Sequence, residues 1–169
     1  MKYWKISLLS VYSALIVWVL LFKFSLSPQA VIEAAINGEN RVINLMPFKA
    51  SGGTREIIMN CLVFFPFGML LGMREGRYRG FKVVVTSFLF SLSIEISQYL
   101  LAIGATDMTD LVTNTLGSCV GYFLYWVLTK IFPKKILDVL VLILGTLAVS
   151  GFILFMGILF TNHVQLNYF

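Results

Sequence analysis

Charged residues are scarce in this chain. They make up 12% of its 169 residues, against 59% hydrophobic residues and a mean hydropathy of +0.88. Soluble domains carry about 25% charged residues, so the composition excludes an ordinary soluble enzyme. It also excludes disorder, because too much apolar surface has to be buried. The sequence therefore predicts an integral membrane protein. A spanning helix takes about 20 residues, which leaves room for one compact bundle and no second domain.

Residues that bind metals are also rare. The chain has one histidine, near its end, and two cysteines, Cys61 and Cys119, which lie far apart in apolar segments. Thiols that bind metals come in clustered pairs, so we predict no metal site and no cofactor, and expect both cysteines to pack as free thiols. The phosphate-binding, serine-hydrolase and zinc-protease motifs are missing as well. A magnesium site made by Glu95, Asp107 and Asp110 stays open, but carboxylates alone do not specify it.

Long apolar runs are what the chain does have. We predict an all-α bundle of five transmembrane helices at about 4–24, 56–73, 81–101, 109–131 and 136–160. Helices are expected because a membrane offers no water to unpaired backbone groups, and the runs lack the alternation of barrel strands. Together they form a single domain, 1–169, in which residues 25–54 make the only long loop.

Lysine and arginine gather on one side of these predicted spans. One side holds Lys2, Lys5, Arg74, Arg77, Arg79, Lys82, Lys130, Lys134 and Lys135; the other holds Lys23, Arg41, Lys49 and Arg55. Because basic residues favour the cytoplasmic side, we predict a cytoplasmic N-terminus, an extracellular C-terminus and an extracellular loop 25–54. The net charge of +5 is then explained by topology, and we expect no nucleic-acid partner.

Polar side chains lie at matching depths inside three of the predicted spans. At 1.5 Å per residue, Asn60, Glu95 and Asn114 fall about 6, 9 and 7 Å below the outer helix ends. A charge at this depth costs about 2.5–3.5 kcal/mol on insertion scales, so it needs a partner or a wet cavity. The matching depths predict a polar ligand-binding pocket that opens outward. Its candidate residues are Arg55, Asn60, Glu95, Gln98, Asp107, Asp110 and Asn114.

Several of these residues also have a purely structural interpretation. Asp107 stands where an N-cap of the 109–131 helix is expected, since its side chain can accept from the first backbone N–H groups. Asn60 and Asn114 can hydrogen-bond between helices. Glu95 can form an ion pair with Arg55. The sequence leaves these alternatives open.

Small residues and one proline indicate how the helices pack. Gly68 and Gly72 form a G-x-x-x-G pair in the second predicted span, and Gly117 and Gly121 form another in the fourth. Such pairs let helix backbones approach closely, and we expect them to serve packing within the bundle rather than dimer contacts. Pro66 removes a backbone donor and should kink the second span.

An ordered set of motifs across four spans resembles the VanZ family of small bacterial membrane proteins. The motifs are Asn44-Leu45-x-Pro47-Phe48, Arg55-Glu56 before Asn60-x-x-x-Phe64-x-Pro66-x-Gly68, Glu95-x-x-Gln98, and Asp107-x-x-Asp110-x-x-x-Asn114-Thr115-x-Gly117. The resemblance covers roughly residues 4–130. It implies a multi-pass protein of the bacterial cell membrane that confers resistance to teicoplanin and related lipoglycopeptides.

Two mechanisms fit these expectations. In the favoured one, a non-enzymatic pocket in the outer leaflet binds the acylated antibiotic or a lipid-linked cell-wall precursor. Membrane lipids are expected as further partners. In the alternative, a membrane enzyme modifies a surface lipid or a wall precursor and uses Glu95 and Asp110 as acid and base.

Overall fold

The computed structural model is a bundle of five long helices. It describes residues 1–22, 36, 43–48, 53–74, 76–101 and 106–161. The helices that are long and apolar enough to cross a membrane are α1 (Lys2–Phe22), α3 (Thr54–Gly72), α4 (Arg79–Leu101), α5 (Met108–Ile131) and α6 (Lys134–Thr161). All five predicted spans are thereby confirmed, each within two residues of its predicted ends. The direction in which the bundle crosses the membrane stays a prediction.

Helices α3 and α5 form the tightest contact of the bundle, and glycines make it possible. A Cβ atom on Gly68 would lie 1.9 Å from the carbonyl oxygen of Ser118, and one on Gly121 would lie 1.9 Å from that of Phe65. A Cβ on Gly117 would meet a backbone oxygen of α3 at 2.3 Å. No larger side chain fits without moving a backbone. The prediction that both G-x-x-x-G pairs pack inside the bundle is therefore confirmed.

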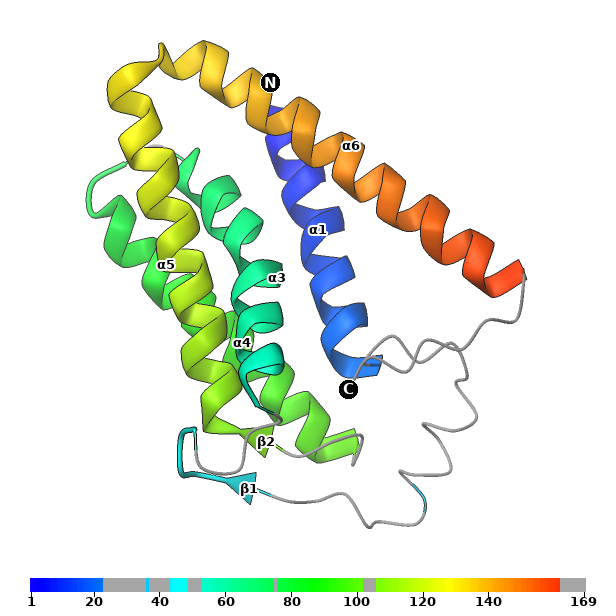
Figure 1. Ribbon diagram of the computed structural model, residues 1–169. Helices are drawn as coiled ribbons and strands as arrows, with labels where there is room; N and C mark the ends of the chain where they lie inside the picture. Colours follow the sequence, from blue (N-terminus) through cyan, green and yellow to red (C-terminus); the bar gives the residue numbers. More distant parts are fainter. Residues whose placement is uncertain (23–35, 37–42, 49–52, 75, 102–105, 162–169) are drawn as a thin grey trace.

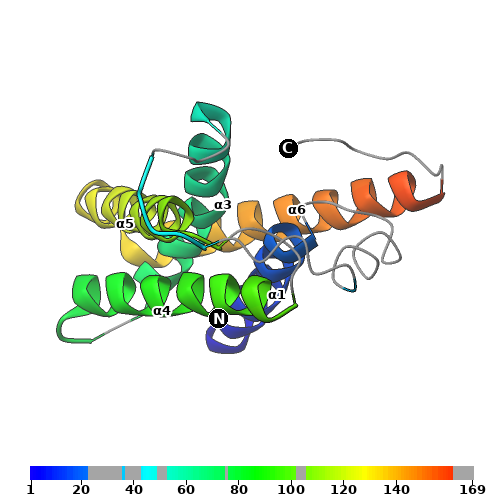
Figure 2. The same cartoon turned by 90° about the horizontal axis from the view of Figure 1, so that it is seen from below.

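The other helices surround this pair unequally. Helix α4 packs along α5, and α1 lies beside α3 (Figure 1). Helix α6 crosses α1 obliquely and then diverges from α3, α4 and α5, as both views show (Figures 1 and 2). A cavity of about 430 Å³ lies between α1, α3 and α6.

Pro66 lies in the middle of α3, and the helix continues through it. A proline has no N–H group, so the carbonyl of Leu62 loses its usual helical donor. The hydroxyl of Tyr12 on α1 donates a 2.8 Å hydrogen bond to the next carbonyl, that of Val63. This bond joins α1 to the weakened part of α3.

A buried carboxylate joins three helices at the end of the bundle that holds the N-terminus. Lys5 of α1 forms an ion pair with Asp138 of α6, whose other oxygen accepts a 2.6 Å hydrogen bond from the hydroxyl of Tyr125 on α5. The indole of Trp4 also donates to Thr146 of α6 at 3.0 Å. The sequence analysis used the basic residues of this end only to predict orientation, and it did not predict this network.

A two-residue parallel ladder closes the opposite end. Strand β1 (Ile43–Asn44) pairs with β2 (Thr106–Asp107), with Asn44 opposite Asp107. Strand β1 lies within the loop predicted at 25–54, and was not foreseen. Most of that loop lies outside the described residues, as do Lys23, Arg41 and Lys49.

Candidate functional site

The predicted site residues gather at one end of the bundle. At this end, which we call the site end, α1 and α4 finish and α3 and α5 begin (Figure 1). Five of the seven predicted residues line a single small cavity, the polar cavity. Its lining residues are Val19, Leu20, Glu56, Asn60, Glu95, Gln98, Asp110 and Asn114. The side chains that the matching depths brought together in the sequence therefore also meet in space.

Two asparagines connect α5 to its neighbours beside the polar cavity. The amide of Asn60 on α3 donates a 2.7 Å hydrogen bond to a carboxylate oxygen of Asp110. The amide of Asn114 donates a 2.9 Å hydrogen bond to the hydroxyl of Ser91 on α4. Both asparagines are buried, so these bonds form where water does not compete. The interhelical role considered for them is confirmed.

Two side chains of α4 hold the ends of other helices. The amide of Gln98 donates a 3.0 Å hydrogen bond to the carbonyl of Leu20, in the last turn of α1. A carboxylate oxygen of Glu95 accepts a 3.0 Å hydrogen bond from the backbone N–H of Asp107. Glu95 is 3% exposed, so this bond forms where water does not compete. The hydrogen bond therefore holds the carboxylate of Glu95 next to the first turn of α5.

Asp107 caps α5. One of its carboxylate oxygens accepts from the N–H of Thr109 at 2.7 Å, which satisfies a backbone donor at the start of the helix. Its other oxygen accepts from the amide of Asn44 at 3.1 Å. The capping interpretation is confirmed, and Asp107 does not line the polar cavity. Asn44 was not among the predicted site residues, although it stands in the first motif of the resemblance.

Arg55 and Glu56 lie in the first turn of α3 with different surroundings. Arg55 is exposed and is not among the residues that line the polar cavity. Glu56 is half-buried and does line it. Sequence reasoning missed Glu56, although it precedes Asn60 by four residues and such a pair shares one helix face.

The polar cavity is small. Its volume is about 20 Å³. A cavity needs roughly 10–15 Å³ to hold one water molecule, so this one admits a water or a small ion and excludes a sugar or a peptide. A large ligand that comes to this end of the bundle contacts the surface around the polar cavity, not its interior.

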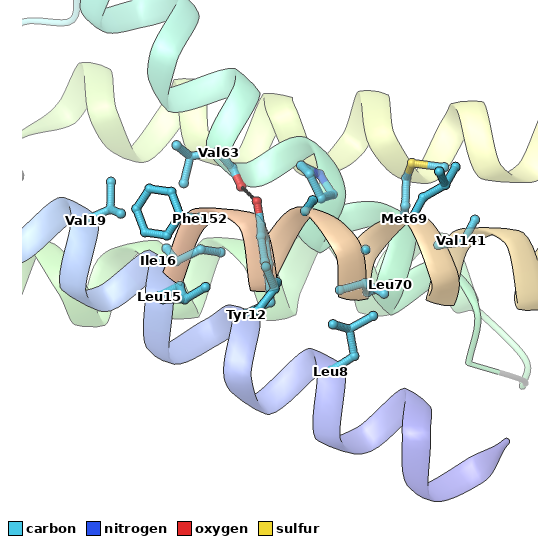
Figure 3. A pocket seen from close by; sticks show the side chains of 15 residues that line it. Leu8, Tyr12, Leu15, Ile16, Val19, Val63, Met69, Leu70, Val141 and Phe152 are labelled. Atoms are coloured by element: carbon cyan, nitrogen blue, oxygen red, sulfur yellow. Dashed lines mark hydrogen bonds between the residues drawn. The ribbon is translucent and has the colours of Figure 1, made fainter. Parts of the chain in front are cut away.

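A much larger cavity lies nearby between α1, α3 and α6, and we call it the apolar groove (Figure 3). Its volume is about 430 Å³, within the range of small-molecule binding sites. Its lining residues are Leu8, Tyr12, Leu15, Ile16, Val19, Val63, Pro66, Met69, Leu70, Val141, Leu144, Gly145, Ala148, Val149 and Phe152. Tyr12 brings the one side-chain hydroxyl, which is bonded to the carbonyl of Val63. Val19 lines the apolar groove and the polar cavity alike.

Comparison with known proteins decides the family. The family model described as VanZ/LLP1 matches residues 9–129, which is most of the chain. The chain belongs to the VanZ family. Protein VanZ of Enterococcus faecium is 35% identical over 161 residues, which cover 95% of this chain and 94% of that protein. No solved structure matches the chain.

The two cavities differ in how far the VanZ/LLP1 match covers them. Every residue that lines the polar cavity lies within residues 9–129. Helix α6 forms one wall of the apolar groove and lies beyond that match, although the similarity to Protein VanZ extends over nearly the whole chain. The polar cavity thus belongs to the part shared across the VanZ family, whereas the apolar groove needs an additional helix.

Proposed function

We propose that this protein confers resistance to teicoplanin and related lipoglycopeptides without enzymatic chemistry. In this proposal, the apolar groove takes up the acyl chain of the antibiotic, or the hydrocarbon chain of a lipid-linked cell-wall precursor. The observation that carries the proposal is the groove itself, a cavity of about 430 Å³ with apolar walls between helices that are long and apolar enough to cross a membrane. Membership of the VanZ family supports the link to glycopeptide resistance.

The acyl chain is the chemical feature that separates teicoplanin from vancomycin. A hydrocarbon chain enters a membrane with about 0.8 kcal/mol per buried CH₂ group, so the acylated antibiotic already concentrates among the lipids. Lipid tails are as apolar as the groove, and the groove therefore adds packing contacts rather than further hydrophobic free energy. Recognition then requires a fit of shape along the chain together with polar contacts to the head.

The polar contacts are proposed to come from the site end. Val19 borders both cavities, so a chain lying in the groove would place its polar head near the surface around the polar cavity. Arg55 is exposed there. The remaining predicted residues would hold the helix ends that form this surface in place. They are Asn60, Glu95, Gln98, Asp107, Asp110 and Asn114. The enzymatic alternative with Glu95 and Asp110 has less support, because the cavity they share admits only a water-sized group.

The test compares three antibiotics in a susceptible bacterial host that expresses the protein: teicoplanin, teicoplanin with its acyl chain removed, and vancomycin. We expect strong protection against teicoplanin and little against the other two. Equal protection against de-acylated teicoplanin would contradict the proposal.

Two variants locate the effect in the apolar groove. Ala148→Phe places a ring in the groove, whereas Leu147→Phe places the same ring on the neighbouring residue, which does not line the groove and is 65% exposed. At equal membrane abundance, Ala148→Phe should reduce teicoplanin resistance toward that of cells without the protein, and Leu147→Phe should retain it. Equal behaviour of the two variants would show that the groove has no part in resistance.

A further inference from the structure

A cavity with basic walls lies at the end of the bundle opposite the site end, where α3 finishes and α4 begins (Figure 1). We call it the basic pocket. Its volume is about 330 Å³, within the range of small-molecule binding sites. Its described lining residues include three cations and no acid; they are Leu71, Arg74, Arg79, Phe81, Lys82, Val83, Val85 and Thr86. These walls favour a negatively charged occupant.

The positive charge of this segment is not balanced within the segment itself. Residues 74–82 hold four basic residues and a single acid, Glu75, which lies outside the described residues. One carboxylate cannot compensate four cations. Within the described part of the chain, neither Arg74 nor Lys82 forms an ion pair. Arg79 donates to the carbonyl of Gly72 at 3.5 Å, and its guanidinium has five N–H groups, so further donors remain.

Helix α4 directs the positive end of its dipole toward the basic pocket. A helix N-terminus favours acidic side chains and disfavours cations. The first turn of α4 contains no acid, and it carries Arg79 and Lys82 instead. Both cations therefore oppose the dipole of their own helix. An anion bound between them would compensate the two side chains and the helix end together, as phosphate groups do at other helix N-termini.

An apolar face of α4 leads away from the basic pocket. Phe81 and Val85 line the pocket, and Leu89 follows at the same spacing of four residues, so the three share one helix face. They are 70%, 36% and 56% exposed. On a helix long and apolar enough to cross a membrane, such a face meets hydrocarbon chains. A ligand with a phosphate and acyl chains would use both surfaces, whereas a soluble phosphate would use only the pocket.

We propose that the basic pocket binds the phosphate headgroup of an anionic phospholipid, with its acyl chains along the face of Phe81, Val85 and Leu89. Arg74, Arg79 and Lys82 contact the phosphate. Basic pockets between membrane helices are typical binding sites for such headgroups. A zwitterionic lipid fits less well, because its headgroup carries a cation that the pocket repels. The site lies apart from the apolar groove, shares no residue with it and does not depend on the resistance proposed above.

Native mass spectrometry of the full chain tests this site. The protein is purified in a neutral detergent and mixed with equal amounts of phosphatidylglycerol and phosphatidylcholine that carry the same acyl chains. We expect each chain to retain one phosphatidylglycerol in preference to phosphatidylcholine. Equal retention of the two lipids would overturn the proposal. A large excess of inorganic phosphate should leave the lipid bound, and displacement by phosphate alone would instead assign the pocket to a soluble anion.

A matched pair of variants ties lipid binding to the basic pocket. Lys82→Gln and Arg77→Gln each remove one positive charge from the same segment, and both side chains are exposed, so both variants should fold. Arg77 does not line the pocket, and its guanidinium lies 4.9 Å from the ring centre of Tyr78. Lys82→Gln should weaken phosphatidylglycerol binding about tenfold, because a charged hydrogen bond is lost. Arg77→Gln should bind like the original protein. An equal loss in both variants would indicate general attraction between basic residues and anionic lipids, and would overturn the site.

Discussion

The hydroxyl of Tyr125 donates a 2.6 Å hydrogen bond to Asp138, whose other carboxylate oxygen pairs with Lys5. The three residues come from α5, α6 and α1, and Tyr125 and Asp138 are 0% and 3% exposed. Every oxygen of the buried carboxylate therefore has a partner. The network fixes the start of α6 to the bundle, whereas the rest of this helix diverges from α3, α4 and α5 (Figure 1).

The network gives a prediction about buried charge. Lys5→Met leaves Asp138 charged and without its cation, and should lower the free energy of unfolding by about 3 kcal/mol. Adding Asp138→Asn removes the uncompensated charge while keeping an acceptor for Tyr125, so the double variant should be more stable than Lys5→Met alone. Denaturant unfolding of the protein in detergent measures both. If the two substitutions are simply additive, Lys5 and Asp138 are not coupled.

The contact between α3 and α5 predicts a strong effect of a single methyl group. Gly121→Ala forces the two helices apart, because the new Cβ would lie 1.9 Å from a backbone oxygen, and should cost at least about 1–3 kcal/mol. Gly151→Ala on α6 is the control, since its Cβ would meet nothing within 4 Å. The abundance in the membrane and the temperature of thermal unfolding should fall for Gly121→Ala only. Equal stability of both would refute the close approach of α3 and α5.

Substitutions of Asp107 can distinguish its role as the helix cap of α5 from a role of its negative charge in resistance. Asp107→Ala removes the acceptor for the N–H of Thr109 and should destabilise the protein by about 1 kcal/mol. Asp107→Asn keeps an oxygen acceptor for the N–H of Thr109 and loses only the bond from the amide of Asn44, so it should be more stable than Asp107→Ala and should retain resistance. A stable Asp107→Asn protein that fails to protect against teicoplanin would instead assign the carboxylate a direct functional role.

The predicted orientation is open to a labelling experiment. Met46 and Arg77 are both exposed and lie at opposite ends of the bundle. In a variant without Cys61 and Cys119, a membrane-impermeant maleimide should label Met46→Cys on intact cells and Arg77→Cys only after the cells are opened. The reverse pattern would place the N-terminus outside the cell.

The depth of a residue within its helix was easier to predict from the sequence than the direction in which its side chain points around the helix axis. The spacing of 1.5 Å per residue fixes depth within a helix, so the common depth of Asn60, Glu95 and Asn114 correctly indicated that they meet. Which neighbour each would bond was not predictable, since it depends on helix rotation. The pairing of Asn114 with Ser91 and of Asn60 with Asp110 appears only in the folded bundle.

Features made by distant segments could not be read from the sequence. Lys5 and Asp138 are 133 residues apart, and each looked like an ordinary charge near a helix end. Strand β1 has two residues, too few to show the alternation that reveals a strand. The apolar groove depends on the tilt of α6 against α1, and α6 reads simply as one more hydrophobic run.

The pairing of β1 with β2 also sets an order of assembly. Asn44 meets Asp107 only after α3 and α4 have been synthesised, because both helices lie between the two strands. Such non-local pairings form late, since the intervening chain must be arranged first. The cap of α5 by Asp107 can form at once, but its bond from Asn44 cannot. During biogenesis, the site end therefore waits for α3 and α4, whereas the contact of Lys5 with Asp138 waits for α6 as well.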